Sequence, residues 1–424
     1  MGTRVMIDTQ NLPKQAGTRK RQSLYLGIDV PLLLATFMLV IFGLLMVYSA
    51  SWDFALYIYD DPTYIFSRQL LWLVLAVAAA IFATFFDYHY WRRLAVPALA
   101  VVVGALLVVL VINEVRHGAT RTLNAGSYMP SEAAKIVAII YLSVWLYSKR
   151  NYLSDVWLGL VPMAVIIGIL SGLILAQPDL SAAATIVFLG GVLFFLAGGD
   201  LKQIAVLLVI VVTVGWFTVQ VHPTGSVRIA SYLDGLVDPT QASYHVRRSI
   251  EAFLKGGVFG VGIGNSNTKL TGLPVPPTDS IFAVVGEETG LFGTTSVVML
   301  YGVLIWRGLK IARNAPDQLG SLLAAGLSIW LTLEAFINMA VMVNLVPFAG
   351  NALPFISAGG SNLVVSLLAI GMLMNIARLS KPKRQTERIA DAPTGVRRSQ
   401  RRRRVPRTGR AASPARRASS RRGG

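Results

Sequence analysis

Ten long apolar segments divide this chain, and they constrain its fold more than any other feature. Their approximate bounds are 28–50, 69–86, 94–113, 133–147, 156–176, 180–197, 203–220, 281–306, 318–344 and 360–377. A helix needs about 20 mostly apolar residues to cross the hydrocarbon core of a membrane. The alternating pattern typical of a membrane β-barrel is not present. The sequence therefore predicts an all-α polytopic membrane protein with ten transmembrane helices, the two longest of which leave room for breaks.

The amino-acid composition supports this class of protein and excludes several types of chemical site. Hydrophobic residues make up 54% of the 424 residues and charged residues only 14%, whereas soluble domains carry about 25% charged residues. The chain has no cysteine, which excludes disulfides, Cys-ligated zinc, iron–sulfur clusters and thiol catalysis. The four histidines show no metal-ligand spacing. No feature of the sequence requires a metal or another cofactor.

The placement of charge predicts the orientation of the helices. Short loops on one side hold Arg92, Arg93, Lys149, Arg150, Lys202, Arg307, Lys310 and Arg313. The first loop on the other side holds Asp53, Asp60 and Asp61. Because short cytoplasmic loops are enriched in Lys and Arg, the cation-rich side is expected to be cytoplasmic, together with both termini.

The predicted organisation has three parts. Residues 1–27 form a basic cytoplasmic tail, residues 28–379 the membrane domain, and residues 380–424 a disordered cytoplasmic tail rich in Arg. The first apolar segment is too long for a cleaved signal peptide, whose apolar part spans about 7–15 residues. Within the membrane domain, residues 221–280 form a long extracytoplasmic loop between the seventh and eighth helices.

The C-terminal tail carries most of the net charge of +18. From Arg378 onward it has 17 Lys and Arg against two acids. Arg-rich disordered segments bind nucleic acid as well as membranes, but tethering beside the last helix makes anionic lipid the nearer polyanion. We therefore expect the tail to bind anionic lipids and expect no nucleic acid as a partner.

Polar residues gather near the predicted outer ends of the helices. They are Glu132, Lys135, Gln177, Asp179, Arg228, Asp279, Glu287, Glu288, Glu334 and Asn338. Ionisable groups at membrane depth are costly and usually face a cavity or a partner. They predict an outward-facing polar site bordered by lipid, suited to a lipid-linked polar substrate. The alternative is internal pairing within the bundle, as the i, i+3 spacing of Glu132 and Lys135 allows.

Asp279 lies in the sequence Pro276-Pro277-Thr278-Asp279-Ser280, directly before the eighth apolar segment. One interpretation is structural, because Thr278 or Asp279 could cap the helix that follows. The other is catalytic, because a carboxylate at a membrane interface could act as a general base. The residues alone leave both open.

A glycine-rich stretch covers residues 255–265, and it does not match a dinucleotide-binding fingerprint. Its backbone N–H groups could approach a pyrophosphate, or the stretch could form a tightly turned or mobile loop. Cations in the same predicted loop favour an anionic ligand or lipid headgroups over solvated charge; they are Arg228, Arg247, Arg248, Lys255 and Lys269.

Residues 25–380 resemble the SEDS family of shape, elongation, division and sporulation proteins, which includes FtsW, RodA and SpoVE. The similarity rests on Leu175–Leu180, on the Gly260–Ser266 run, on Thr278–Glu288, and on Leu353–Ser361. Gly118–Arg121 followed by Pro130–Lys135 matches a further block. Gly286-Glu287-Glu288 and the Leu-Pro-Phe-Ile-Ser run resemble the FtsW branch more than RodA.

The resemblance implies a peptidoglycan glycosyltransferase that polymerises lipid II into β-1,4 glycan strands during cell division. It implies ten helices, a location in the bacterial cytoplasmic membrane at the division septum, and Asp279 as the catalytic base. Arg121, Lys269 or a divalent cation such as Mg²⁺ or Mn²⁺ would neutralise the leaving undecaprenyl pyrophosphate. A class B penicillin-binding protein and other divisome proteins are the implied partners.

The candidate substrate-binding residues come from the outer polar groups and from these motifs. They are Arg121, Glu132, Lys135, Gln177, Asp179, Arg228, Lys269, Glu287, Glu288, Asn338 and Ser357. The chain departs from the family pattern at Thr122, Met129, Ser280, Glu334 and Ala358. Two other functions remain open: a lipid II flippase that performs no chemistry, and a non-catalytic scaffold for a transpeptidase. Asp279 discriminates between them, because an enzyme needs its carboxylate whereas a scaffold does not.

Overall fold

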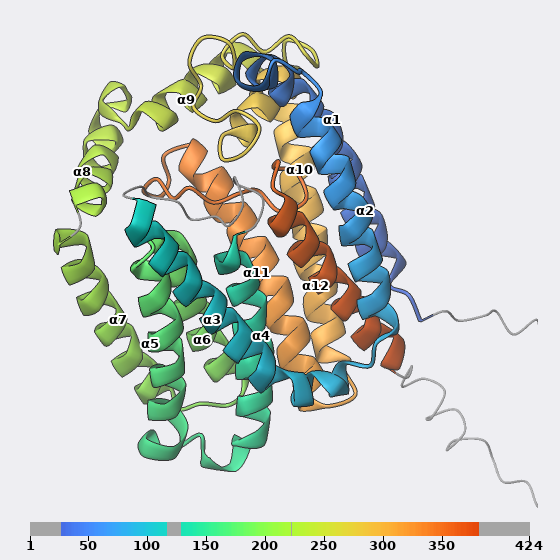
Figure 1. Cartoon of the computed structure of the whole chain (residues 1–424), viewed down its shortest axis with the longest axis vertical. Helices are drawn as coiled ribbons and strands as arrows, with labels where there is room; N and C mark the ends of the chain where they lie inside the picture. The colour runs from blue at the N-terminus through green and yellow to red at the C-terminus, as the bar shows by residue number, and fades with distance from the viewer. Residues whose placement is uncertain (1–26, 117–128, 222, 381–424) are drawn as a thin grey trace, which may run out of the picture. The chain divides into compact units, whose positions relative to one another are not determined.

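The computed structural model describes residues 27–116, 129–221 and 223–380, and within these ranges every regular element is helical (Figure 1). The long helices of the membrane domain are α1 (Val30–Tyr59), α2 (Tyr64–Phe85), α3 (Trp91–Arg116), α4 (Pro130–Ser148), α5 (Val161–Leu175), α6 (Leu180–Leu196), α7 (Leu201–Val221), α10 (Ile281–Arg313), α11 (Gln318–Met342) and α12 (Gly360–Leu379). Two further helices, α8 (Pro223–Val237) and α9 (Tyr244–Gly256), lie between α7 and α10.

Each of the ten predicted apolar segments coincides with one of these long helices. Eight helices, the one containing Val156–Leu175 among them, are long and apolar enough to cross a membrane. The apolar parts of the other two, Leu180–Leu196 in α6 and Leu201–Trp216 in α7, are shorter. The protein is therefore an all-α polytopic membrane protein, as the hydropathy pattern predicts.

Small residues allow the helices to approach closely. A Cβ on Gly371 of α12 would collide with the backbone of Ala80 in α2, and one on Gly43 of α1 would collide with the backbone at Phe355. Gly326 of α11 gives similar space to Ile139 of α4. Interfaces between helices in lipid are enriched in small residues because van der Waals packing, rather than the hydrophobic effect, drives their association.

The predicted long loop at 221–280 is more ordered than a simple connection. It contains α8 and α9, which lie at the upper end of the bundle in Figure 1. Helix α9 buries Val246, Ser249, Ala252 and Gly256, whose spacing of three and four places them on one helical face. Residues 257–280 then return to the bundle by turns and bends.

Helix α10 is broken at Gly290, where the backbone adopts φ 66° and ψ −163°. The amide N–H groups of Leu291 and Phe292 donate to the carbonyls of Gly257 and Val258, at 3.0 Å and 3.2 Å. In return, the N–H groups of Val261 and Gly262 donate to the carbonyls of Glu287 and Glu288, at 2.9 Å and 3.0 Å. The break lies in one of the two long segments where the sequence leaves room for it, and it ties the glycine-rich stretch to α10.

Candidate functional site

Asp279 lies in a turn that two other segments hold in place. The side-chain amide of Asn338, in α11, donates to the backbone carbonyl of Asp279 at 2.9 Å. The hydroxyl of Ser357 donates to the carbonyl of Thr278 at 2.7 Å, and the N–H of Ala358 donates to the carbonyl of Pro277 at 2.8 Å. The backbone on both sides of the half-buried Asp279 is thereby held in place.

The segment that follows α11 passes directly over this turn. A Cβ built on Gly350 would lie 3.1 Å from the carboxylate oxygen Oδ2 of Asp279. The carbonyl of Asn351 accepts a second hydrogen bond from Asn338 at 2.6 Å. Gln69 of α2 holds the far end of the segment through the N–H of Gly359, at 3.2 Å.

The N-cap of α10 is Ser280, not Asp279 or Thr278. The hydroxyl of Ser280 makes no capping hydrogen bond to the helix. The structural interpretation of Asp279 as the cap of this helix is therefore wrong, because the helix begins at Ile281, one residue too late for Asp279 to occupy the capping position.

Arg228 and His245 approach the same region from α8 and α9. The guanidinium of Arg228 lies 5.4 Å from the centre of the Phe348 ring, and the ring of His245 lies 4.4 Å from it. Burial, and secondarily the positive charge of Arg228, lower the pKa of His245. Phe348 is two residues before Gly350, so Arg228 contacts the same segment that covers Asp279.

Glu132 and Lys135 of α4 form a buried cluster with Glu334 of α11. The ammonium of Lys135 lies 2.9 Å from Glu132 and also pairs with Glu334, and Asn362 of α12 donates to Glu132 at 3.0 Å. Lys135 is 3% exposed and Glu334 only 1%. The predicted pairing within α4 is present, and it extends to a residue 199 positions away. Two carboxylates on one ammonium leave a formal surplus of one negative charge.

Glu287 anchors the turn at residues 266–268. Its carboxylate accepts hydrogen bonds from the hydroxyl of Ser266 and from the N–H groups of Asn267 and Thr268, the last two at 3.1 Å and 3.2 Å. These two backbone N–H groups, just after the glycine-rich stretch, are therefore occupied by a carboxylate from the protein itself. Glu287 is buried, at 1% exposure.

Glu288, the next residue, binds Lys269 and α1. Its Oε1 lies 3.1 Å from the ammonium of Lys269 and accepts a hydrogen bond of 2.6 Å from the hydroxyl of Ser49. The ammonium of Lys269 also donates to the carbonyls of Ser49 and Gly264, at 3.1 Å and 3.0 Å. The ammonium group of Lys269 is therefore engaged by groups of the protein itself.

The remaining candidates lie elsewhere. Gln177 donates to the carbonyl of Leu106 in α3 at 2.7 Å, and Asp179 caps α6 by accepting from the N–H of Ala182 at 3.2 Å. Both contacts are local to the α3, α5 and α6 side of the bundle. Arg121 lies outside the described residues.

An apolar groove of about 690 Å³ is formed by residues of α9, α10 and α11 and the segments that follow α9 and α11. Phe282 and Met339, which line it, are close in sequence to Asp279 and Asn338. The groove continues between α9, α10 and α11 along Phe253, Leu291 and Phe336. The lining of the groove thus comes within three residues of Asp279 along α10 and within one residue of Asn338 along α11.

The sequence did not single out Gln69, Phe348, Gly350 or Asn351, each of which supports or covers the turn. Gly350 and Asn351 directly precede the Leu353–Ser361 motif. This proximity is the sequence feature that could have identified them as part of the site. Among the described residues, no three His, Asp or Glu side chains are grouped so that they could hold a metal ion.

These features define a polytopic helical membrane protein with a supported aspartate at one end and an apolar groove beside it. A family model described as "Cell cycle protein", which covers FtsW, RodA and SpoVE, matches residues 30–382. The chain belongs to this family and is FtsW-like.

Two relatives illustrate the similarity. Stage V sporulation protein E of Bacillus subtilis (strain 168) is 35% identical over 357 residues, which are 83% of this chain and 98% of the relative. A probable peptidoglycan glycosyltransferase FtsW of Geobacter metallireducens is 36% identical over 357 residues, covering 83% and 95% of the two chains.

A chain from the solved structure of a peptidoglycan synthase complex that coordinates polymerization and crosslinking shares the fold. Its TM-score is 0.66 at 24% identity, and the match covers 84% of this chain and 99% of the other.

Proposed function

We propose that this protein is a peptidoglycan glycosyltransferase that polymerises lipid II into β-1,4 glycan strands on the outer face of the bacterial cytoplasmic membrane. The observation that carries the proposal is a half-buried aspartate, Asp279, three residues before Phe282, which lines an apolar groove of about 690 Å³. A substrate with a polar sugar head and a polyprenyl tail needs both surfaces side by side. Relatives named as probable peptidoglycan glycosyltransferases support the same function.

In the proposed reaction, the 4-hydroxyl of a lipid II sugar attacks the anomeric carbon of the growing glycan. Asp279 accepts the hydroxyl proton, the new C–O bond forms, and the bond from the anomeric carbon to undecaprenyl pyrophosphate breaks. The α-linked donor becomes a β-linked product, so the configuration inverts. A pyrophosphate leaves readily once its charge is neutralised, and Arg228, which contacts Phe348 two residues before Gly350, is our candidate for this role.

No step of this proposal passes through a metal ion. The described residues offer no group of three metal-binding side chains, so Mg²⁺ or Mn²⁺ would have to be held by Asp279 and by pyrophosphate oxygens rather than by a protein cage. Such an ion would supply charge neutralisation for the leaving group.

We further propose a class B penicillin-binding protein as partner, together with other divisome proteins at the division septum. The fold shared with a chain of a peptidoglycan synthase complex supports such an assembly. We also propose that α6 and α7 cross the membrane with the other eight long helices. A reporter enzyme that works only outside the cytoplasm should then be active when it is fused near Thr240. Activity of a reporter that works only in the cytoplasm, fused at the same position, would contradict this orientation.

The function is tested by incubating the purified full-length protein and its cognate class B penicillin-binding protein with lipid II. Polymerised glycan should form, and Asp279→Asn should abolish it while leaving the thermal unfolding midpoint unchanged. Asn keeps the size of the side chain but cannot accept a proton at neutral pH. The matched control is Asp53→Asn, which alters an exposed acid of α1.

The two rival functions give different results in the same assay. A flippase would move lipid II across a vesicle membrane and form no glycan. A scaffold would support the partner enzyme equally well with Asp279→Asn. Normal glycan synthesis by the Asn variant would show that Asp279 is not the base.

A further inference from the structure

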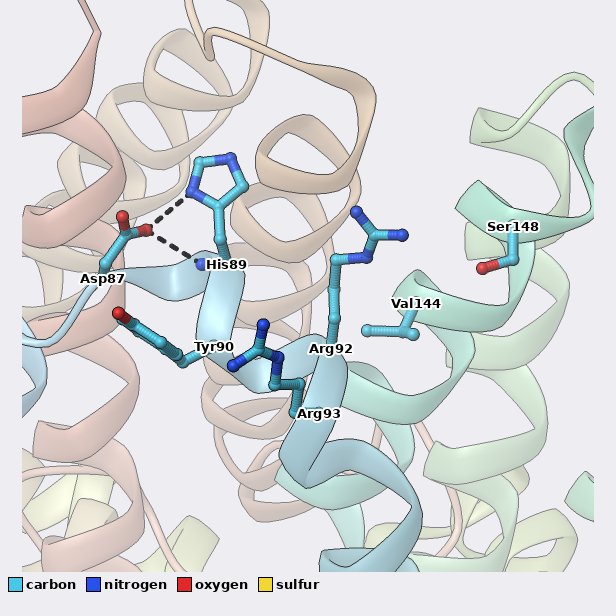
Figure 2. Close-up of a pocket in the computed structure, with 7 residues that line it drawn as sticks. All are labelled: Asp87, His89, Tyr90, Arg92, Arg93, Val144 and Ser148. Carbon is cyan, nitrogen blue, oxygen red and sulfur yellow. Dashed lines mark hydrogen bonds and ion pairs between the residues drawn. The ribbon is translucent and has the colours of Figure 1, made fainter.

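A second cavity lies at the opposite end of the bundle, where α2 leads into α3 and α4 ends. Its volume is about 660 Å³, and it is lined by Asp87, His89, Tyr90, Arg92, Arg93, Val144 and Ser148. Figure 2 shows Arg92 extending from the start of α3 into the space between α3 and α4, where Ser148 and Val144 lie. The proposed glycosyltransferase reaction, on the outer face, makes no use of this cavity.

The acidic groups near the cavity are already occupied. Asp87 accepts from the backbone N–H of His89 at 2.9 Å and lies 2.6 Å from Nδ1 of its ring. Asp317 accepts from the hydroxyl of Tyr88 at 2.7 Å and from the N–H of Gly320 at 2.8 Å, and lies 3.3 Å from Nε2 of His89. Both carboxylates therefore contact the ring of His89 and accept hydrogen bonds from N–H groups in the first turn of a helix.

The cationic groups, in contrast, are directed to aromatic rings. The guanidinium of Arg92 lies 5.2 Å from the centre of the Tyr147 ring, and that of Arg150 lies 5.7 Å from the same ring. The guanidinium of Arg93 lies 6.0 Å from the ring of Tyr90. Within the described ranges, Arg92 and Arg93 take part in no ion pair. Of the three arginines, Arg92 and Arg93 line the cavity, and two guanidinium groups without a carboxylate of their own favour binding of an anion.

Exposed aromatic side chains place the cavity at the depth of lipid headgroups. Tyr90, Tyr152 and Trp157 are exposed around this end of α3, α4 and α5, and Tyr and Trp are enriched at the boundary between hydrocarbon and water. The surface of α3 beyond the cavity is apolar and exposed at Leu94 and Val96. An acyl chain could follow this surface while its phosphate remains beside the arginines.

We infer that this cavity binds the phosphate headgroup of an anionic phospholipid of the cytoplasmic leaflet. Basic pockets between transmembrane helices on the cytoplasmic side are suited to such headgroups. The arginines supply charge and paired donors for phosphate oxygens, and the hydroxyl of Ser148 supplies a further donor. Free inorganic phosphate has the same chemistry, but it would gain nothing from the apolar surface of α3.

The test measures binding of cardiolipin and of phosphatidylcholine to the detergent-purified full-length protein by native mass spectrometry. The variant is Arg92→Gln with Arg93→Gln, and the control is Lys310→Gln with Arg313→Gln, which removes two cations of α10 at the same end of the bundle. All of these proteins keep the basic tail, so its contribution is equal in each. Wild type and control should retain cardiolipin in preference to phosphatidylcholine, and the double arginine variant should bind it about 30-fold more weakly.

A second variant distinguishes the effect of the arginine charges from the effect of the cavity volume. Val144→Trp keeps both arginines but fills the cavity, and it should also lose the preference for cardiolipin. Equal cardiolipin binding by wild type and both pocket variants would overturn the inference. Competition by millimolar inorganic phosphate, with no preference for the lipid, would overturn the assignment to a phospholipid.

Discussion

Asn338 donates one hydrogen bond to the backbone carbonyl of Asp279, at 2.9 Å, and another to that of Asn351, at 2.6 Å. One amide group thereby joins the turn before α10 to the segment that covers it. Glu334 lies four residues earlier on α11, on the same helical face, and pairs with Lys135. Helix α11 thus positions the candidate base and, one turn away, a buried ionic cluster.

Asn338→Ala should lower turnover of lipid II by about tenfold to a hundredfold, because a displacement of about 1 Å in a reacting group can have such an effect. As a positioning residue, Asn338 should affect kcat more than KM. Asn314→Ala, at an exposed position after α10, should leave both unchanged. A loss seen only in KM would instead indicate that Asn338 binds substrate directly.

Lys135→Met should destabilise the protein by about 3–5 kcal/mol, because it leaves two buried carboxylates without a cation. Lys255→Met is the matched control, since Lys255 and Glu251 form a partly exposed pair of α9, and such pairs contribute at most about 1 kcal/mol. The thermal unfolding midpoint in detergent measures both. Adding Glu334→Gln to Lys135→Met should recover part of the loss, and failure to do so would argue against the cluster.

Gly290→Ala should destabilise the connection between α9 and α10 by about 1–3 kcal/mol, because the residue combines a positive φ with a close backbone contact to Gly260 and Val258. Gly302→Ala, on the same helix, meets no atom within 4 Å of the new Cβ and should lose no stability. Limited proteolysis of residues 257–280 offers a local measurement. Equal protection in both variants would contradict the role assigned to the break.

The sequence predicts that Arg121 and Lys269 both neutralise the leaving pyrophosphate. The structure leads us to expect that their Ala variants differ in thermal stability. Lys269→Ala leaves Glu288 buried without its cation, so thermal stability and activity should fall together, and Lys269→Ala with Glu288→Gln should regain stability. Arg121→Ala should weaken substrate use without a change in stability. Activity lost in the stable Lys269 and Glu288 double variant would restore Lys269 to the role of a pyrophosphate partner.

Deletion after Ser380 should leave polymerisation in vitro intact and reduce binding to vesicles that contain anionic lipid. Binding by a peptide of residues 381–424 should weaken between 0.1 M and 1 M salt, because the Debye length falls from about 10 Å to about 3 Å. Vesicle cosedimentation measures the peptide, and the glycan assay measures the truncated protein. A folded but inactive truncation would show that the tail takes part in catalysis.

The positions of the long helices were predictable because hydropathy alone determines which segments can lie in a membrane. The i, i+3 pair of Glu132 and Lys135 was also predictable from local sequence, since helical spacing places the two on one face. The third member, Glu334, was not predictable as their partner, because its position depends on the packing of α4 against α11.

The glycine-rich stretch shows a different limit. Its glycines indicated either a ligand cradle or a turn, and both need positive φ angles and close backbone approach. Only the position of α10 decides that the carbonyls of Glu287 and Glu288 occupy the N–H groups of Val261 and Gly262. Likewise, the N-cap at Ser280 depends on hydrogen bonds between the turn and residues 338–358, which no local pattern encodes.

The cluster of Glu132, Lys135 and Glu334 also has a consequence for membrane insertion during synthesis. Helix α4 carries both an acid and a base three residues apart, so the two can pair within the helix and enter the bilayer as a neutral unit. Helix α11 arrives almost two hundred residues later with a single carboxylate at Glu334, whose ammonium partner is on α4. Completion of the fold therefore depends on the earlier helix being in place to receive the later one.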